Sequence, residues 1–311
     1  MRVSVVVCAY TLERWDDLVV AVTSCADQTR APDEIAVVID YNDELLERAR
    51  SQFPHVIVVA NTQTKGLSGA RNTGVAATTG DVIAFLDDDA RATATWLEEL
   101  TRALDDRRVA GVGGWVVPRW PRDVEPAGYP STFMWVLGCS YEGLPADGAS
   151  IRNPIGASMV LRREVFQSIG GFTSGLGRIG KTPLGCEETE LCIRYTTAHP
   201  DERFVLARRA VVVHHVPPAR VTLHYFVTRC YGEGLSKAMV SHLVGRGRGL
   251  ESERSHLARA VPREFLESLG QLPSRPATGG RRAALLVTGV VATAFGYVRG
   301  RVALRAGAPE A

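Results

Sequence analysis

The stretch Asp81-Val-Ile-Ala-Phe-Leu-Asp87-Asp88-Asp89 is the most informative feature of this sequence. Its apolar part, Val82–Leu86, has the pattern of a buried strand, and carboxylates follow it directly. Neighbouring carboxylates are costly to bury unless a cation compensates them, and ligands of open α/β sheets bind at the carboxyl ends of the strands. The stretch therefore predicts either a Mg²⁺ or Mn²⁺ site that holds a phosphorylated substrate, or a polar loop that ends a core strand.

Strand and helix patterns alternate around this stretch, from the N-terminal residues to Val117. We expect strands at Val3–Val7, Glu34–Ile39, Val56–Ala60, Asp81–Leu86 and Val109–Val117, and helices at Arg14–Cys25, Asp43–Ser51, Ser68–Ala77 and Thr95–Leu104. Alternation with short connections is typical of a parallel sheet that is covered by helices on both faces. The sequence therefore predicts an α/β fold.

The alternation stops at Pro118. Residues 118–154 are rich in proline, glycine and aromatic residues and predict irregular structure with one short apolar segment at Phe133–Leu137. Beyond them we expect helices at Arg162–Ile169, Glu187–Thr196 and Leu223–Leu243, a strand at Val205–Val213, a linker at Pro273–Gly280 and an apolar run at Ala283–Val298. We accordingly expect a domain of residues 1–220 with halves 1–118 and 119–220, a helical extension of residues 221–272, and a tail of residues 273–311.

The composition of the 311 residues is that of an ordinary globular protein, with 45% hydrophobic and 23% charged residues. This length allows one large α/β domain with an appendage, or two small domains. A net charge of +2 gives no case for nucleic-acid binding. The six cysteines contain no Cys-x-x-Cys pair, which argues against a structural zinc or a disulfide framework and favours a reducing compartment. Val3–Val7 is too short for a signal peptide, so we expect a cytoplasmic protein.

A glycine-rich segment, Gly66–Gly74, lies between the third expected strand and the acidic stretch. Glycines at a loop-to-helix junction let backbone N–H groups approach a phosphate, the helix N-terminus adds a favourable partial charge, and Arg71 adds a full one. An ordinary glycine-rich turn is the alternative. Because Asp87–Asp89 follow so closely, we favour a phosphate-binding loop.

The run Gly175–Thr182 fits the Gly-x₄-Gly-Lys-Thr pattern of a P-loop. A P-loop follows a buried strand and opens a long helix, whereas the preceding residues Arg162–Ile169 look helical and Pro183 would shorten the next helix. We therefore interpret the match as accidental, and a P-loop phosphotransferase as an alternative that a strand directly before this run would support. Arg178 and Lys181 remain candidates for contacts with a substrate phosphate or carboxylate.

Acidic residues and histidines occur at two later positions. Glu187, Glu188 and Glu190 open an expected helix, where acidic side chains either compensate the helix dipole or include a general base. His214 and His215 end an expected strand, where a histidine is either a metal ligand or an ordinary packed residue. The residues alone leave both alternatives open.

Taken in order, these motifs make the chain resemble family 2 glycosyltransferases of the GT-A fold from about Val3 to His215. The segments that are similar to family motifs are Val3–Thr11, Gln28-Thr29, Pro32–Ile35, Lys65-Gly66, Ala70–Asn72, Gly74, the DxD motif at Asp87–Asp89, Gly170–Phe172 and Glu187-Glu188. The chain departs from the family where Cys8 replaces a proline, Ile39 replaces an aspartate and Tyr41-Asn42 replace Gly-Ser. The resemblance implies a mixed, mainly parallel, Rossmann-like sheet with helices on both faces, to which the composition adds a C-terminal helical tail.

The resemblance also implies the chemistry of the site. The donor is a nucleoside-diphospho-sugar, expected to be UDP-linked, and its implied binding residues are Ala9, Tyr10, Thr11, Asp40, Lys65, Gly66, Arg71 and Asp88. A Mg²⁺ or Mn²⁺ ion is held by Asp87, Asp89 and either His214 or His215. Glu188, in the position of the family's catalytic aspartate, removes the proton of an acceptor hydroxyl, and direct displacement inverts the anomeric configuration.

Two segments narrow the resemblance to enzymes that act on polyprenyl-phosphate-linked sugars. Ile151–Ser158 and Pro183–Leu191 are similar to the glucosyl-dolichyl-phosphate glucuronosyltransferase type, which implies a lipid-linked acceptor; otherwise the acceptor is another carbohydrate in polysaccharide biosynthesis. The alternative function is a catalytically inactive nucleotide-sugar-binding protein in a glycan-assembly complex. Asp89 and the carboxylate at position 188 argue against this alternative.

The C-terminal segment predicts contact with a membrane surface. Ala283–Val298 is a sixteen-residue run without charges, shorter than the about 20 residues of a usual spanning helix. The basic residues that flank it are Arg281, Arg282, Arg299, Arg301 and Arg305, and they favour an anionic leaflet. We expect peripheral or shallow attachment at the cytoplasmic face of the cell membrane. An ordinary docked C-terminal helix is the alternative.

Overall fold

The computed structural model describes residues 1–177 and 185–306. The chain forms two compact units. The first contains Met1–Val117, Pro145–Thr182 and Glu187–His215, and the second contains Pro118–Leu144, Pro183–Cys186 and Val216–Ala311. The contacts predicted for Arg178 and Lys181, and most of the run that resembles a P-loop, fall outside the described residues.

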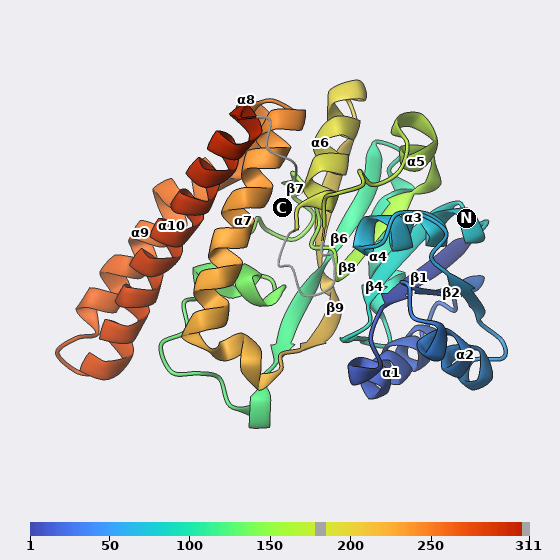
Figure 1. The fold of residues 1–311 in the computed structure, drawn as a ribbon, viewed down its shortest axis with the longest axis horizontal. Helices are drawn as coiled ribbons and strands as arrows, with labels where there is room; N and C mark the ends of the chain where they lie inside the picture. The colour runs from blue at the N-terminus through green and yellow to red at the C-terminus, as the bar shows by residue number, and fades with distance from the viewer. Residues whose placement is uncertain (178–184, 307–311) are drawn as a thin grey trace. The chain divides into compact units, whose positions relative to one another are not determined.

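The described strands form one sheet in the order β3-β2-β1-β4-β8-β6-β9-β5, with β7 beside β9 (Figure 1). Their bounds are β1 Val3–Ala9, β2 Glu34–Ile39, β3 Ile57–Ala60, β4 Val82–Asp87, β5 Ala90–Ala92, β6 Val109–Arg119, β7 Ser150–Ile151, β8 Ser158–Arg162 and β9 Arg203–His215. β1 pairs in parallel with β2 and β4, and β2 pairs in parallel with β3. β8 lies antiparallel between β4 and β6, so β6 runs in the direction of β4. The sheet is mixed and mainly parallel, as predicted.

Helices of the first unit cover this sheet. They are α1 Trp15–Ala26, α2 Asp43–Gln52, α3 Leu67–Ala77, α4 Trp96–Arg102, α5 Arg163–Ile169 and α6 Glu187–Ala198. Successive residues of β1 and β4 are buried whichever way they point, as expected of strands that are covered on both faces. On one face, Phe85 of β4 packs edge-on against Phe166 of α5 and Phe172. This face of the core joins α3, α5 and α6 to the sheet.

The close packing of α3 on the sheet depends on Gly74. A Cβ atom at this position would lie 2.4 Å from Cγ1 of Val6 in β1, so a larger residue would push the helix away. At the other end of α3, Gly66 has a φ of 122°, which glycine adopts without strain, and its N–H donates to the carboxylate of Asp40 directly after β2. The start of α3 is therefore held at the carboxyl ends of the parallel strands.

The structure removes the context that a P-loop needs. β8 leads directly into α5, which was predicted at Arg162–Ile169 and is confirmed as a helix at Arg163–Ile169. The described residues between this helix and Gly177 contain no strand. The match of the run Gly175–Thr182 to a P-loop is therefore accidental, as predicted, because a phosphate-binding P-loop must follow a strand directly.

Helices and loops make up most of the described residues of the second unit. It contains short 3₁₀ helices at Pro121–Asp123, Ser131–Leu137 and Pro218–Val221, and the helices α7 Leu223–Leu243, α8 Arg246–Gly249, α9 Glu251–Gly270 and α10 Pro276–Arg305. α10 packs along α7 and α9 (Figure 1). The linker predicted at Pro273–Gly280 is wrong from Pro276 onward. The fixed φ of a proline and its missing N–H suit the first turn of a helix, and Pro276 begins α10 in this way.

Candidate active site

Three potential metal ligands meet at the carboxyl end of β4. Asp87 ends this strand, Asp89 follows it, and His214 arrives from β9 because it pairs with Ala90 of β5. One ligand atom from each of the three side chains lies within 4.8 Å of the others. Nε2 of His214 lies 3.0 Å from Oδ1 of Asp89. Two carboxylates and an imidazole fit Mn²⁺ or Mg²⁺, and the imidazole favours a transition metal over Mg²⁺.

The neighbouring His215 makes a different contact. Its Nδ1 lies 2.7 Å from Oδ2 of Asp17 in α1, and its backbone N–H donates to the carbonyl of Asp89 over 2.7 Å. Successive side chains of a strand point to opposite faces of the sheet, so the two rings cannot reach the same ligand cluster. Of the two predicted histidines, His214 is the one that the structure brings to the carboxylates.

A cation from the N-terminal segment compensates the acidic cluster. Nη1 of Arg14 lies 2.8 Å from Oδ1 of Asp88 and 3.2 Å from Oδ2 of Asp89. Burial raises the pKa of Asp88 to about 7; Arg14 acts against this shift, and the neighbouring aspartates add to it. Arg14 was not predicted as a site residue, because it belongs to no recognisable motif. Its position shortly after Tyr10 and Thr11, at the end of a strand, was the one feature of the sequence that could have indicated a place near the site.

Arg71 lies fully within the protein. Its Nη1 donates to Oε1 of Glu187 over 2.6 Å, and its Nη2 donates to the carbonyl of Gly156 over 3.0 Å. Nη2 also lies 3.4 Å from Oδ1 of Asp87. The guanidinium therefore connects the start of α6 to the end of β4. These contacts hold the two carboxylates in place, and the predicted contact of Arg71 with the donor stays a prediction.

The acidic residues at the start of α6 have different surroundings. Glu187 is buried against Arg71, as described above. Glu190 is also buried and pairs with Arg194, one turn further along the helix, over 2.8 Å. Glu188 lies between them in sequence and is partly exposed. Of these three carboxylates, Glu188 is thus the one with access to solvent.

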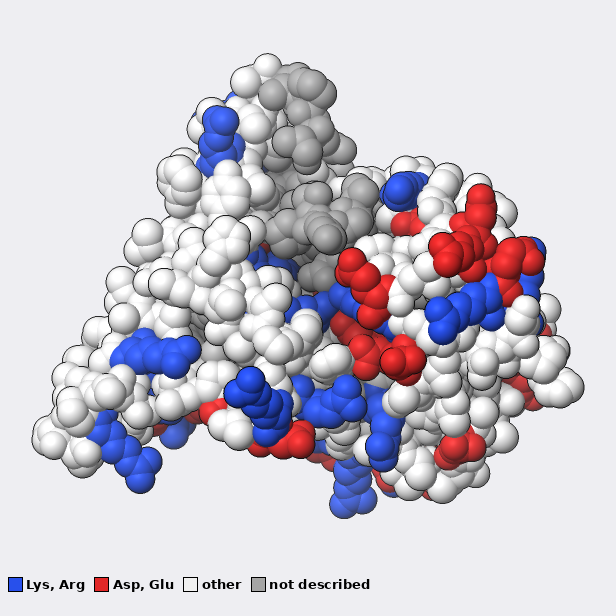
Figure 2. Space-filling view, turned by 60° about the horizontal axis from the view of Figure 1, so that its bottom comes forward, with Lys and Arg blue, Asp and Glu red and all other residues white. Residues whose placement is uncertain are grey.

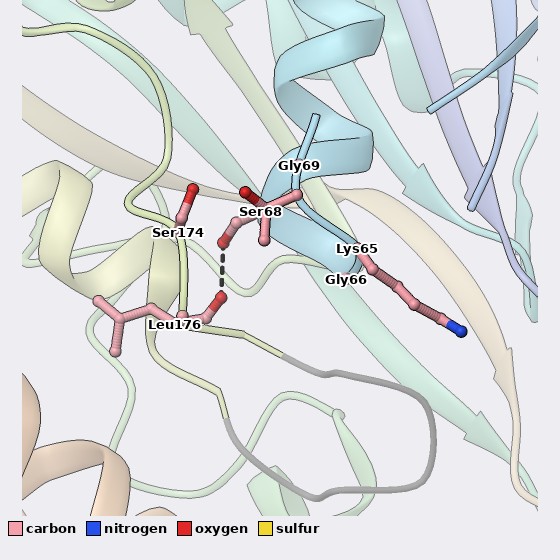
Figure 3. A pocket seen from close by; sticks show the side chains of 8 residues that line it. Lys65, Gly66, Ser68, Gly69, Ser174 and Leu176 are labelled. Atoms are coloured by element: carbon pink, nitrogen blue, oxygen red, sulfur yellow. Dashed lines mark hydrogen bonds between the residues drawn. The ribbon is translucent and has the colours of Figure 1, made fainter. Parts of the chain in front are cut away.

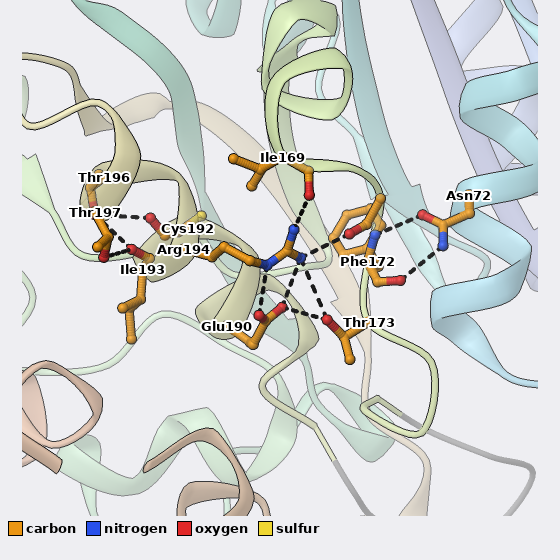
Figure 4. Close-up of polar contacts among 11 residues, drawn as sticks. Asn72, Ile169, Phe172, Thr173, Glu190, Cys192, Ile193, Arg194, Thr196 and Thr197 are labelled. Atoms are coloured by element: carbon orange, nitrogen blue, oxygen red, sulfur yellow. Dashed lines mark hydrogen bonds and ion pairs between the residues drawn. The ribbon is translucent and has the colours of Figure 1, made fainter. Parts of the chain in front are cut away.

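Figure 4 shows how Glu190 and Arg194 tie α6 to the segment after α5. Arg194 donates to both carboxylate oxygens of Glu190 and to the carbonyl oxygens of Ile169 and Gly171. The hydroxyl of Thr173 donates to Glu190 over 2.9 Å. Because these groups satisfy one another, Glu190 has a structural role, and the network fixes where the first turn of α6 lies.

The predicted nucleoside-binding residues lie together at the ends of β1 and β2. The backbone N–H of Asp40 donates to the carbonyl of Ala9 over 2.8 Å, and the side chain of Asn42 donates to the carbonyl of Tyr10 over 3.1 Å. The hydroxyl of Thr11 accepts a hydrogen bond from the N–H of Glu13 and so begins a short 3₁₀ helix. These contacts hold the chain from residue 9 to residue 11 beside Asp40.

The carboxylate of Asp40 organises the loop before α3. It accepts the N–H of Gly66 over 3.0 Å and the side-chain amide of Asn61 over 2.7 Å. The next residue, Tyr41, has a φ of 51°, in the left-handed region where glycine is favoured. Glycine adopts this backbone conformation without strain, whereas a residue with a side chain, such as Tyr41, adopts it at a cost in free energy. The ring of Tyr41 is exposed, and Nζ of Lys65 lies 6.0 Å from its centre.

A narrow pocket lies beside this loop. It is lined by Thr64, Lys65, Gly66, Ser68, Gly69, Ser174, Gly175 and Leu176. Figure 3 shows the hydroxyl of Ser68 bonded to the carbonyl of Leu176, over 2.6 Å, while the amine of Lys65 points away from both. The structure thus brings Lys65 and Gly66 to one loop, with the Lys65 side chain directed outward.

Sequence comparisons with known proteins identify the family. Residues 4–170 match the model of the family described as Glycosyl transferase family 2. The chain belongs to this family. Glucosyl-dolichyl phosphate glucuronosyltransferase from Haloferax volcanii is 30% identical to this glycosyltransferase over 305 residues, which cover 96% of each protein. Succinoglycan biosynthesis protein ExoM from Rhizobium meliloti is 28% identical over 202 residues, which cover 61% of this chain and 58% of that protein.

A solved structure shows the same fold. The mannosyltransferase PcManGT from Pyrobaculum calidifontis, in complex with GDP-Man and Mn²⁺, matches with a TM-score of 0.57 and 18% sequence identity. The match covers 94% of this chain and 86% of that chain. At this identity the likeness shows the fold alone. The predictions of a GT-A fold and of a glycosyltransferase are confirmed.

Proposed function

We propose that this glycosyltransferase moves a sugar from a nucleoside-diphospho-sugar, UDP-linked, to an acceptor hydroxyl with inversion at the anomeric carbon. The observation that carries the proposal is the cluster of Asp87, Asp89 and His214 at the carboxyl end of β4. β1 and β2 end at the same edge of the parallel part of the sheet, where the expected nucleoside-binding residues lie. This edge is where ligands of open α/β sheets bind.

The donor side is assigned from the loops at this edge. Ala9, Tyr10, Thr11 and Asp40 face the nucleoside, and Asp88 faces the ribose. Gly66 and Lys65 belong to the loop that Asp40 organises, and the outward amine of Lys65 supplies a positive charge for the donor phosphates. Arg71 acts as a positioning residue, because Nη1 and Nη2 already contact protein oxygen atoms.

A Mn²⁺ or Mg²⁺ ion is proposed to be held by Asp87, Asp89 and His214. When bound, the ion neutralises the negative charge of the diphosphate. The protein contributes the arrangement of the ligands: Arg71 fixes Asp87, and the pairing of β5 with β9 fixes His214 against Asp89. Arg14 adds a second positive charge at the same carboxylates.

Glu188 is proposed as the general base. Its carboxylate takes the proton of the acceptor hydroxyl as that oxygen forms a bond to the anomeric carbon, and the bond from this carbon to the nucleoside diphosphate breaks. The nucleoside diphosphate leaves with the bonding electrons, and no covalent enzyme intermediate forms. The difference in burial supports the assignment, because Glu187 and Glu190 are buried and Glu188 is partly exposed.

We further propose a lipid-linked acceptor, a sugar on a polyprenyl phosphate, and attachment of the enzyme to the cytoplasmic face of the membrane. The name of the relative from Haloferax volcanii includes glucosyl-dolichyl phosphate. In the described part of the chain, α10 is long and apolar enough to cross a membrane. An enzyme held at the membrane surface would work where such an acceptor lies.

A donor screen tests this function. The protein is incubated with Mn²⁺, a panel of nucleotide-sugars and a glycosylated polyprenyl phosphate, and the released nucleoside diphosphate is measured. The expected result is release with a UDP-sugar and a product whose anomeric configuration, read by NMR coupling constants, is opposite to that of the donor. Retention of configuration would exclude the direct displacement. Donor binding without release or transfer would instead favour a binding protein of the same fold.

A further inference from the structure

One face of α10 is exposed and apolar. Every exposed residue from position 284 to position 298 is Ala, Val or Phe. The largest of these exposed side chains are Val287, Val291, Phe295 and Val298, and Val302 follows in the next turn. The five side chains are between 52% and 64% exposed. Their spacing of three or four residues places them on one side of the helix, and we call this set the outer stripe. In the part of Figure 2 where α9 and α10 lie, white atoms predominate and the charged side chains are mainly separate Lys and Arg residues.

The opposite face of α10 is fixed to α7. A Cβ atom at Gly296 would lie 2.1 Å from the carbonyl oxygen of Tyr231, and one at Gly234 would lie 2.1 Å from that of Thr293. Glycines of both helices thus allow direct contact between the two backbones, a packing in which small residues are required. α10 is therefore a docked element of the second unit, and its outer stripe is the part that remains available for a partner.

The partner helix α7 is unsuited to a bilayer interior. It carries a mostly enclosed ionic network in which Glu233 lies 2.9 Å from Arg229 and 3.3 Å from the buried Lys237. Lys237 also pairs with Glu253 of α9 over 2.8 Å. Moving these charges into hydrocarbon is costly. Because α10 is packed backbone to backbone on α7, a transmembrane position for α10 would either break this packing or carry the network into the membrane.

The charges at the ends of the outer stripe indicate what covers it. α10 contains five arginines and no acidic residue. Of these arginines, Arg281 is exposed at one end of the stripe, and Arg299 and Arg305 are exposed at the other. If a second copy of α10 covered the stripe, arginines would face arginines in either orientation of the two helices. Anionic lipid head groups are complementary to both ends at once.

We infer that α10 lies in the plane of an anionic membrane surface, with the outer stripe inserted at the boundary of head groups and acyl chains, and does not span the bilayer. This inference rests on the membrane attachment proposed above and specifies its geometry. A helix in this position typically inserts its apolar face by about 5–10 Å. The second unit then stays on the water side, and its ionic network remains outside the hydrocarbon.

Depth measurements on spin labels test the geometry. Val287→Cys, Phe295→Cys and Val302→Cys are each labelled in the full chain and bound to vesicles of equal parts phosphatidylcholine and phosphatidylglycerol. The native cysteines are buried, apart from the partly buried Cys8, so the unsubstituted protein gives the background. In the plane of the membrane, all three labels should report the same shallow depth. In a span, the first and last labels would differ by about 22 Å along the helix axis.

The outcomes separate this inference from the attachment itself. Binding with a steady change of depth from Val287 to Val302 would overturn the in-plane geometry and leave the attachment standing. No binding to these vesicles, with all labels accessible to water, would overturn both. Distances between labels of two copies that place the stripes together would show that a second chain covers the stripe, and would also overturn the inference.

A charge in the stripe gives a matched test. Val291→Asp combined with Phe295→Asp should weaken vesicle binding by roughly 10²-fold or more, because two apolar side chains no longer enter the membrane. Val20→Asp, at an exposed valine of α1, is the control and should bind like the unsubstituted protein. Release of nucleoside diphosphate in solution should be unchanged in both variants. Equal vesicle binding by the stripe variant and the control would contradict the inference.

Discussion

Glu188→Gln and Glu187→Gln should separate catalysis from folding at the start of α6. Glu187→Gln removes one partner of a contact of 2.6 Å in which both side chains are at most 5% exposed. Loss of one partner of a buried ion pair costs about 3–5 kcal/mol. Asp87 still lies 3.4 Å from Arg71 and keeps part of the compensation. We therefore expect a loss of about 3 kcal/mol in the free energy of unfolding, at the lower end of that range.

Glu188→Gln should have the opposite effect. The amide keeps the shape of the side chain but cannot accept the acceptor proton, and a positioned general base contributes about 10²–10⁴-fold to turnover. Donor affinity and the free energy of unfolding should change little, because Glu188 is partly exposed. Urea denaturation and release of nucleoside diphosphate are measured for both variants. Normal turnover by Glu188→Gln, together with an inactive Glu187→Gln that is as stable as the unsubstituted protein, would contradict the assignment of Glu188 as the base.

Three further variants test contacts elsewhere. Arg14→Gln should lower the stability of the metal-free protein, since Asp88 loses its cation, and added Mn²⁺ should restore part of it in thermal melts. Burial would raise the pKa of Glu233, but its Lys and Arg neighbours on α7 lower this pKa to about 2. The ionised carboxylate should therefore stabilise the fold above its ordinary pKa of 4.5, and this stabilisation should be lost as the pH falls to about 2. Glu233→Gln should make the free energy of unfolding, measured in urea titrations, depend less on pH in this acid range. Gly74→Ala should cost about 1–3 kcal/mol of unfolding free energy, because its Cβ would overlap Val6.

Much of the sheet was predictable because each strand has its own apolar pattern. β2 and α7 have the predicted bounds, and the acidic end of β4 indicated the edge where the potential metal ligands meet. β8 was missed, since Ser158–Arg162 is short and runs straight into α5. It is nevertheless the strand that separates β4 from β6. The apolar pattern of a strand does not show which distant strand it pairs with, so the order of the strands could not be predicted in this way.

The composition of the site was more predictable than its contacts. The sequence indicated the aspartates and a histidine, but the choice of His214 depends on the register of β9 against β5. The contact of Arg14 with Asp88 joins residues 74 positions apart, and the ion pair of Arg71 with Glu187 joins residues 116 positions apart. Such contacts depend on the folded chain and have no local pattern in the sequence. The linker expected at Pro273–Gly280 failed for a different reason. Proline and glycine usually break helices, yet Pro276 occupies the first turn, where proline is favoured.

The most direct test of the proposed mechanism is the dependence of nucleoside diphosphate release on Mn²⁺ after removal of metal with a chelator. The unsubstituted enzyme should lose activity in excess chelator and regain it with Mn²⁺. Asp89→Ala and His214→Ala should need more Mn²⁺ and turn over more slowly, whereas His215→Ala, which changes only the contact with Asp17, should keep the response of the unsubstituted enzyme. Full activity in excess chelator, or equal losses in His214→Ala and His215→Ala, would contradict a metal-dependent transfer at this site.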